Sequence, residues 1–81
     1  MKFEEFKQWL EHKDKYTPAS IKDILSRLRR ANRILQFQNE DIYLFKLSQS
    51  DEFKQASVSV RSQIRRSVKL YFQYIKEVET E

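Results

Sequence analysis

Arginine and lysine side chains with little acidic counter-charge are the residues of this 81-residue sequence whose types and spacing could do chemistry. Five basic residues and one acid lie between positions 22 and 33, and five basic residues and no acid lie between 60 and 76. A guanidinium group is a planar fork that matches the oxygens of a phosphate. The two segments therefore predict a polyanion as partner, although a basic helical face is more often simply a solvated surface.

The charge is unevenly distributed along the chain. The two basic segments carry +4 and +5 and the whole chain carries +4, so the remainder carries −5. A surface that serves only solubility usually mixes both signs. The presence of two such segments, with more arginine than lysine, favours phosphate binding over the solvated-surface interpretation.

No other group of residues indicates catalysis or metal binding. The sequence has no cysteine, and its single histidine, His12, has no nearby partners at metal-ligand spacing. We expect Tyr71 to pack in the core and Tyr74 to be half exposed. None of the tyrosines has the surrounding charges that a nucleophile in phosphoryl transfer needs: Tyr16, Tyr43, Tyr71 and Tyr74. We therefore expect a non-catalytic chain without cofactor or metal.

Helices must position the basic residues. The sequence has no glycine and one proline, and its abundant Lys, Gln, Glu, Leu and Arg favour helix, so we predict an all-α fold. The spacing of Phe3, Phe6, Trp9 and Leu10 predicts a first helix over 2–13. Thr17 followed by Pro18 is typical of a helix start, and a second helix is predicted over 18–36 with one stripe of apolar residues: Ile21, Ile24, Leu25, Leu28, Ala31 and Leu35.

The second half predicts a short helix and a long one. Asn39 is a predicted cap for a short helix that buries Ile42, Phe45 and either Leu44 or Leu47, with one further turn over 51–56. Ser57 or Ser59 is expected to cap a last helix over 58–77. Its apolar stripe is Val60, Ile64, Val68, Tyr71, Phe72, Ile75 and Val78. Residues 1–81 thus form one domain of four to five helices.

The basic residues fall opposite these stripes when each helix is drawn at about 100° per residue. In the second helix the polar cluster is Lys22, Ser26, Arg29, Arg30 and Arg33; in the last helix it is Arg65, Lys69 and Lys76, with Arg61 and Arg66 at its edges. We expect both surfaces to lie on one side of the bundle and to form a single groove for a nucleic-acid backbone.

The segment TPASIKDILSRLRRANRIL, residues 17–35, resembles the core-binding domain of tyrosine recombinases, the phage integrases. The opening FEEFKQWLEHK, the central DIYLFKL and the final YFQYIKE extend the resemblance over about 3–77. The family often has a glycine before the cap and a threonine in the second half, and neither occurs here. The resemblance implies a SAM-like bundle that holds double-stranded DNA for recombination and integration, whereas the family's catalytic residues belong to another domain.

The resemblance also implies which residues contact DNA. In the second helix they are Thr17, Ser20, Lys22, Ser26, Arg29, Arg30 and Arg33; in the last helix they are Ser57, Ser59, Arg61, Arg65, Arg66 and Lys69.

Double-stranded DNA is accordingly the expected partner, and the alternative is a free-standing regulatory module that binds a recombinase or a repressor protein. Whether the chain is a fragment or free-standing stays open. No apolar run approaches the ~18 residues of a membrane span, and MKFEEFKQWL carries acids where a signal peptide would not. We expect a cytoplasmic protein with no membrane and no small-molecule partner.

Overall fold

Five helices make up the secondary structure of the part of the chain that the computed structural model describes, residues 2–38 and 42–79. They are α1 (Phe3–His12), α2 (Pro18–Ile34), α3 (Tyr43–Ser48), α4 (Asp51–Gln55) and α5 (Val58–Glu79). The predicted all-α class is confirmed, and the four helices with predicted boundaries start and end within two residues of them. Asn39, the predicted cap of the short helix, lies outside the described residues.

The helix ends follow from local chemistry. Thr17 Oγ1 accepts a hydrogen bond from the Ser20 N–H (3.1 Å), and Pro18 occupies the first turn of α2, as predicted. The Ser57 hydroxyl accepts from the Val60 N–H (3.2 Å), so Ser57, one of the two predicted residues, caps α5. After α1 the chain turns at Asp14, whose φ of 57° lies in the left-handed region. Aspartate tolerates that region better than most residues, and this chain has no glycine to supply.

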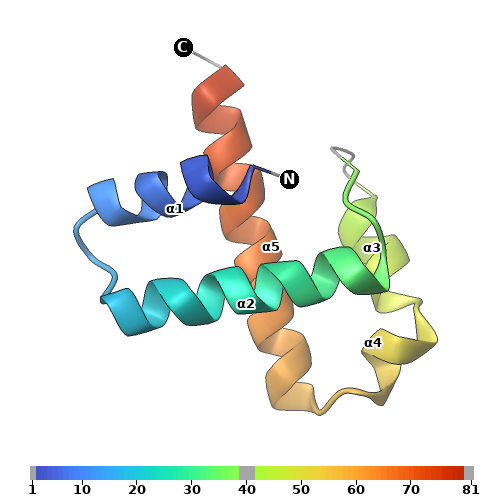
Figure 1. Ribbon diagram of the computed structural model, residues 1–81. Coiled ribbons are helices and arrows are strands. Elements are labelled where there is room, and N and C mark those ends of the chain that lie inside the picture. The colour runs from blue at the N-terminus through green and yellow to red at the C-terminus, as the bar shows by residue number, and fades with distance from the viewer. Residues whose placement is uncertain (1, 39–41, 80–81) are drawn as a thin grey trace.

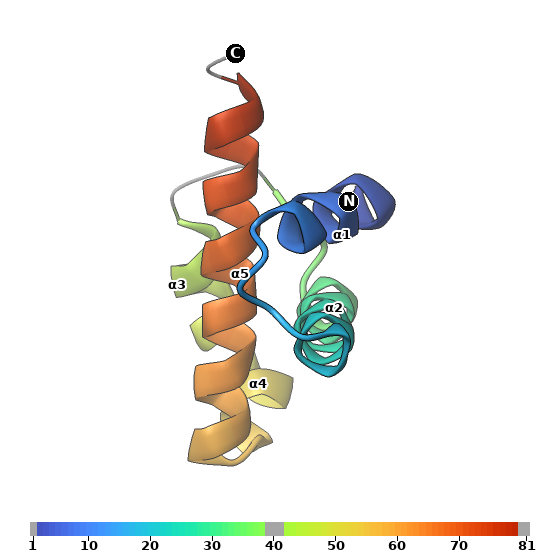
Figure 2. The same cartoon turned by 90° about the vertical axis from the view of Figure 1, so that its left-hand side faces the viewer.

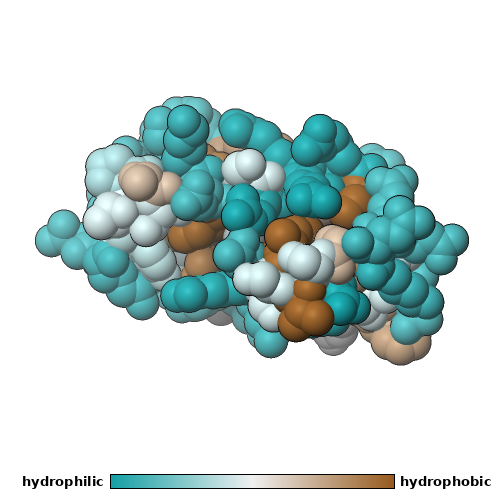
Figure 3. All heavy atoms as spheres, turned by 90° about the horizontal axis from the view of Figure 1, so that it is seen from below, coloured by the Kyte–Doolittle hydropathy of each residue, from teal (hydrophilic) through white to brown (hydrophobic). Residues whose placement is uncertain are grey.

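The long helix α5 runs the length of the molecule, and α1 and α2 cross it on one side (Figures 1 and 2). Leu28 in the middle of α2 and Ile64 and Val68 of α5 are fully buried in the shared core. The end of the molecule at which α5 begins is mostly hydrophilic, and apolar side chains appear there only in small patches (Figure 3). Among the described residues, no helix is long and apolar enough to cross a membrane.

Aromatic packing and polar contacts join α1 to the C-terminal half of α5. The Phe6 ring lies 5.2 Å from the Tyr71 ring, and the Trp9 ring lies 5.8 Å from that of Tyr74. The Trp9 Nε1–H donates to Glu77 Oε2 (2.5 Å), and Lys13 Nζ pairs with Glu77 Oε1 at 3.2 Å. These two contacts define what we call the α1 clasp, which joins residues more than 60 positions apart.

Three expectations about burial are wrong. Val78, the last residue of the predicted stripe of the last helix, is 48% exposed. Ile42 and Phe45 are 50% and 66% exposed, whereas Tyr43 is buried together with Leu47. The reason is that α3 begins after Ile42, and residues four apart on this short helix share the face that meets the core. Tyr74, expected to be half exposed, is only 7% exposed because it packs against the aromatic rings of α1.

Candidate nucleic-acid interface

The outer face of α5 holds the most concentrated positive charge. The buried residues Ile64, Val68 and Tyr71 turn one side of the helix inward. The opposite side carries a shallow hollow of about 410 Å³. We call this hollow the α5 face; its lining residues include no acid and are Ser62, Arg65, Arg66, Lys69, Leu70 and Gln73. All three of its cations are exposed, so they can meet an approaching anion.

An aromatic ring of a neighbouring helix contacts one of the three cations of the α5 face. The Arg65 guanidinium carbon lies 5.2 Å from the centre of the Phe53 ring of α4, a cation–π distance that limits how far the side chain can move. Arg61 is different, because it is half buried and its Nε is enclosed without a hydrogen-bond partner among the described residues. Arg65 is nevertheless exposed, so an anion can reach it. Arg61 is the least accessible of the predicted contact residues.

The basic residues of α2 are exposed, but acids stand beside them. A hollow of about 540 Å³ between α1 and α2 is lined by two acids, Glu4 and Glu11, together with three cations, which are Lys7, Lys22 and Arg29. The Arg29 guanidinium carbon lies 5.1 Å from the centre of the Phe3 ring. Within the described part of the chain, Lys22 and Arg29 form no ion pair, yet the nearby carboxylates lower the positive potential that a phosphate would meet there.

Basic and acidic side chains also lie together at the C-terminal end of α2. Arg30 and Arg33 line a hollow of about 470 Å³ with Glu52 of α4. Ser26 is exposed on the same outer side of α2. The acids on both sides of α2 come from distant parts of the chain, so helical spacing within α2 could not reveal them.

Two of the predicted hydroxyl residues at the helix starts, Thr17 and Ser57, act as helix caps. Thr17 donates its hydroxyl hydrogen to Ser20 Oγ (3.0 Å) and accepts from the Ser20 N–H, and Ser57 caps α5. Ser59 is exposed in the first turn of α5. All four side chains remain exposed, but Thr17 and Ser57 stabilise helix starts whether or not an anion is present.

The single basic groove that we expected is not what the structure shows. Because α2 and α5 pack on each other through their apolar stripes, the faces opposite those stripes point away from each other (Figure 2). The basic residues are consequently divided among separate hollows. The polar sides of the two helices come together at their edges, where Arg27 Nε donates to Gln63 Oε1 (2.8 Å).

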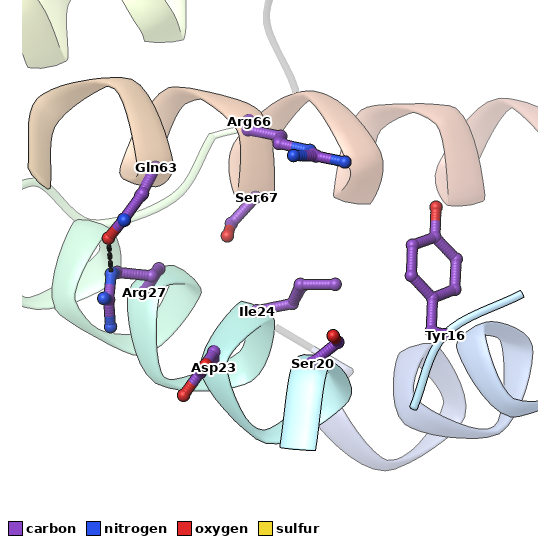
Figure 4. A pocket seen from close by; sticks show the side chains of 8 residues that line it. All are labelled: Tyr16, Ser20, Asp23, Ile24, Arg27, Gln63, Arg66 and Ser67. Carbon is purple, nitrogen blue, oxygen red and sulfur yellow. Dashed lines mark hydrogen bonds between the residues drawn. The ribbon is translucent and has the colours of Figure 1, made fainter. Parts of the chain in front are cut away.

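A further hollow lies at this helix crossing, and Figure 4 shows the side chains that line it. It brings together Ser20 and Arg27 of α2 with Arg66 of α5. Arg66 also lines the α5 face, so the two hollows share this side chain. Of the predicted residues, Ser20 and Arg66 are thus the pair that the fold brings together from different helices.

Sequence reasoning missed the neutral and flanking members of these hollows. Arg27 lies on the flank of α2 at about 100° per residue, outside the predicted polar cluster, and Gln63 carries no charge. Ser62 and Gln73 could have been found, since they lie three or four residues from Arg65, Arg66 or Lys69 and so share their side of α5.

Three tyrosines are buried in the core, and two of them have raised pKa values. Tyr43 is 1% exposed and its hydroxyl donates to the Leu35 carbonyl oxygen (2.8 Å). Desolvation by burial raises the pKa of Tyr43 from 10.0 to about 12, because the buried site disfavours the charged phenolate. Burial, followed by the nearby Glu5 and Tyr71, also raises the pKa of Tyr74. Packing in the core, as expected for Tyr71, is what the structure shows for all three.

A comparison of the chain with protein-family models, with curated proteins and with solved structures finds no match. The resemblance to the core-binding domain of tyrosine recombinases therefore stays a prediction from the sequence.

Proposed function

We propose that this chain is a non-catalytic module that binds double-stranded DNA by its phosphates, as the core-binding domain of a phage integrase would. The observation that carries the proposal is the α5 face, where Arg65, Arg66 and Lys69 line one hollow with no acid. Ser62 and Gln73 add neutral hydrogen-bonding groups of the kind that contact phosphate and sugar oxygens.

The α5 face is the primary contact in this proposal, and the basic residues of α2 are secondary. Since α2 and α5 turn their apolar stripes toward the shared core, their outer faces point apart, and we do not expect one straight duplex to lie on both. The acids beside Arg29 and Arg30 weaken the attraction of α2 for phosphate further. A small interface of this kind binds DNA weakly and without sequence preference, with a Kd of about 10⁻⁴ to 10⁻⁶ M at physiological salt.

The salt dependence of binding tests the proposal. Replacing Arg65 and Lys69 together (Arg65→Gln/Lys69→Gln) removes two phosphate contacts, which lowers the slope of log K against log salt by about 1.8. The control, Lys15→Gln/Lys54→Gln, removes the same charge from exposed positions outside the α5 face and outside the hollows that the basic residues of α2 line. Fluorescence anisotropy of a labelled 20-base-pair duplex at several salt concentrations measures both slopes.

The two variants must give different slopes if the proposal is right. The control should keep nearly the wild-type slope, because only general charge is lost. Equal slopes for both variants would mean that binding depends on net charge and not on the α5 face. Circular dichroism melting of each variant confirms that the helices remain folded, which matters because Arg65 also contacts Phe53.

A second candidate function rests on a different observation, the exposure of Phe45 and Ile42 on and beside α3. Contiguous exposed apolar patches often mark protein contacts, and these two side chains lie three positions apart in the sequence. In this alternative the chain is a regulatory module that binds a recombinase or a repressor. Absence of any duplex shift at low salt, together with retention of one such protein that Phe45→Ser abolishes, would favour it.

A further inference from the structure

A hollow next to the α5 face lies where α3 meets α5. Its volume is about 360 Å³, and we call it the α3–α5 groove. The helix α3 lies beside the middle of α5 in both views (Figures 1 and 2), and the buried ring of Tyr43 holds it there, 6.3 Å from the Phe72 ring. The residues that line the groove are Leu44 of α3 and Lys69, Phe72, Gln73 and Lys76 of α5.

The floor of the groove is apolar. Leu44 and Phe72 are partly buried against the core, and they line the groove with the part that the core leaves uncovered. The hydrophobic effect favours covering such surface with another apolar group, and the phosphates of a DNA backbone have none. The floor therefore favours a protein side chain as the occupant over a phosphate.

The walls of the groove are basic. Lys69 and Lys76 are exposed, and neither forms an ion pair with any residue of the described ranges. Glu77 follows Lys76 in the sequence, but its carboxylate is held by Trp9 and Lys13 in the α1 clasp. Because no acid lines the groove, its two ammonium groups complement the carboxylates of an acidic partner.

The spacing of these residues indicates what kind of segment fits. Lys69, Phe72 and Lys76 follow an i, i+3, i+7 pattern, so they lie along one side of α5. Seven positions of a helix span about 10.5 Å, so the two lysines lie about one turn from the ring on either side of it. A second helix with two acids seven positions apart and an apolar residue between them carries the complementary groups at the same spacing. An amphipathic helix that lies in a groove is a common mode of protein recognition.

We infer that the α3–α5 groove binds an acidic amphipathic helix of a partner protein, whose apolar residue covers the floor while its carboxylates pair with Lys69 and Lys76. The inference goes beyond DNA binding and does not depend on it. It also differs from the contact at Phe45 and Ile42, because neither of those side chains lines the groove.

One consequence of the inference rests on the proposed DNA binding. Lys69 and Gln73 line both the α3–α5 groove and the α5 face. A helix in the groove therefore occupies part of the surface that a duplex would contact, and the two partners should compete for Lys69.

The experiment is a titration of the ¹⁵N-labelled full chain with a designed peptide, followed by NMR. The peptide has about 16 residues, near the length at which an isolated helix becomes stable in water. It carries two glutamates seven positions apart and one leucine between them, on a background of alanine and glutamine. Two control peptides replace either both glutamates by glutamine or the leucine by serine. We expect saturable shifts of the Leu44, Phe72 and Lys76 amides, and binding roughly tenfold weaker for each control, which lacks either two exposed ion pairs or one apolar contact.

Three single substitutions test which surface the peptide uses. Lys76→Gln removes a cation of the groove alone, Arg65→Gln removes one of the α5 face alone, and Lys54→Gln removes an exposed cation of neither. Lys76→Gln should weaken peptide binding about threefold and change duplex affinity no more than Lys54→Gln does. Arg65→Gln should do the reverse. Because Lys76 is exposed, its variant should melt like the wild type, and thermal melting checks this.

The results separate the inference from the DNA proposal. Peptide binding that needs Lys76, without any duplex binding, supports the inference and refutes the DNA proposal. Shifts of the Lys76 and Leu44 amides with duplex, and none with the peptide, would overturn the inference and leave DNA binding intact. Equal binding of the three peptides, or an unchanged peptide affinity in Lys76→Gln, would also overturn it, because the charge and the apolar floor of the groove would then make no contribution.

Discussion

Replacing Tyr43 by phenylalanine tests how α3 is attached to α2. The Tyr43 hydroxyl donates to the Leu35 carbonyl at the end of α2 and lies 3.3 Å from the Ala31 carbonyl oxygen. Tyr43→Phe keeps the buried ring and removes this hydrogen bond, which is worth about 1 kcal/mol. A domain of 81 residues has about 4–12 kcal/mol of total stability. The melting temperature should therefore fall by about 4–8 °C.

The same substitution has the opposite effect at high pH. The pKa of Tyr43 is raised from 10.0 to about 12, so the folded protein holds this proton more tightly than the unfolded chain. The stability that comes from this bound proton is complete below pH 10 and is lost as the pH rises toward 12. The free energy of unfolding of the wild type then falls by up to roughly 2.7 kcal/mol. The phenylalanine variant has no such loss. The two stability curves should therefore cross near pH 11, at about 1 kcal/mol of loss.

Urea unfolding followed by circular dichroism at a series of pH values from 7 to 11.5 measures both effects. Titration of the other tyrosines is common to both proteins and cancels in the difference. Equal stability at pH 7 would refute the hydrogen bond as a source of stability. Parallel alkaline curves would refute the argument that burial holds the proton on Tyr43.

Two further predictions concern the α1 clasp and the core. The hydrogen bond from Trp9, followed by that from Lys13, lowers the pKa of Glu77, so its stabilising effect is complete above pH 4.5 and is lost as the pH falls through the lower folded value. Acid should therefore shift Trp9 fluorescence to the red in a step that Glu77→Gln lacks, and an identical acid transition in that variant would contradict the clasp. Leu28 is fully buried where α2 packs in the core, so Leu28→Ala should cost about 3–5 kcal/mol in urea unfolding. A loss below about 1.5 kcal/mol would contradict this packing, since that is the cost of a volume-conserving change.

Much of the fold could be predicted because the helix signals are local. Thr17 and Pro18 start α2 and Ser57 starts α5. The middle of each predicted apolar stripe is buried, whereas some residues toward its ends are only partly buried and Val78 is 48% exposed. The short helix α3 was less predictable. With six residues it has too few turns for a period to be read, so whether Tyr43 or Ile42 turned inward depended on where the helix began.

The candidate site could be predicted only in part. Helical spacing identified Arg65 and Lys69 as exposed side chains on the outer side of α5. It could not show which acids from other elements would stand beside α2, because Glu52 and Glu4 reach it through tertiary packing. The direction of the two basic faces was also beyond the sequence, since it depends on how α2 and α5 cross.

The α1 clasp joins the first helix of the fold to the last turns of α5, which has a consequence for synthesis of the chain. Trp9 and Lys13 leave the ribosome long before Glu77, and until then the aromatic side chains of α1 lack their partners Tyr71 and Tyr74. Contacts between such distant segments form late in folding. Until the last turns of α5 have been made, the aromatic side chains of α1 therefore stay without these partners, and a chaperone has access to them during that period.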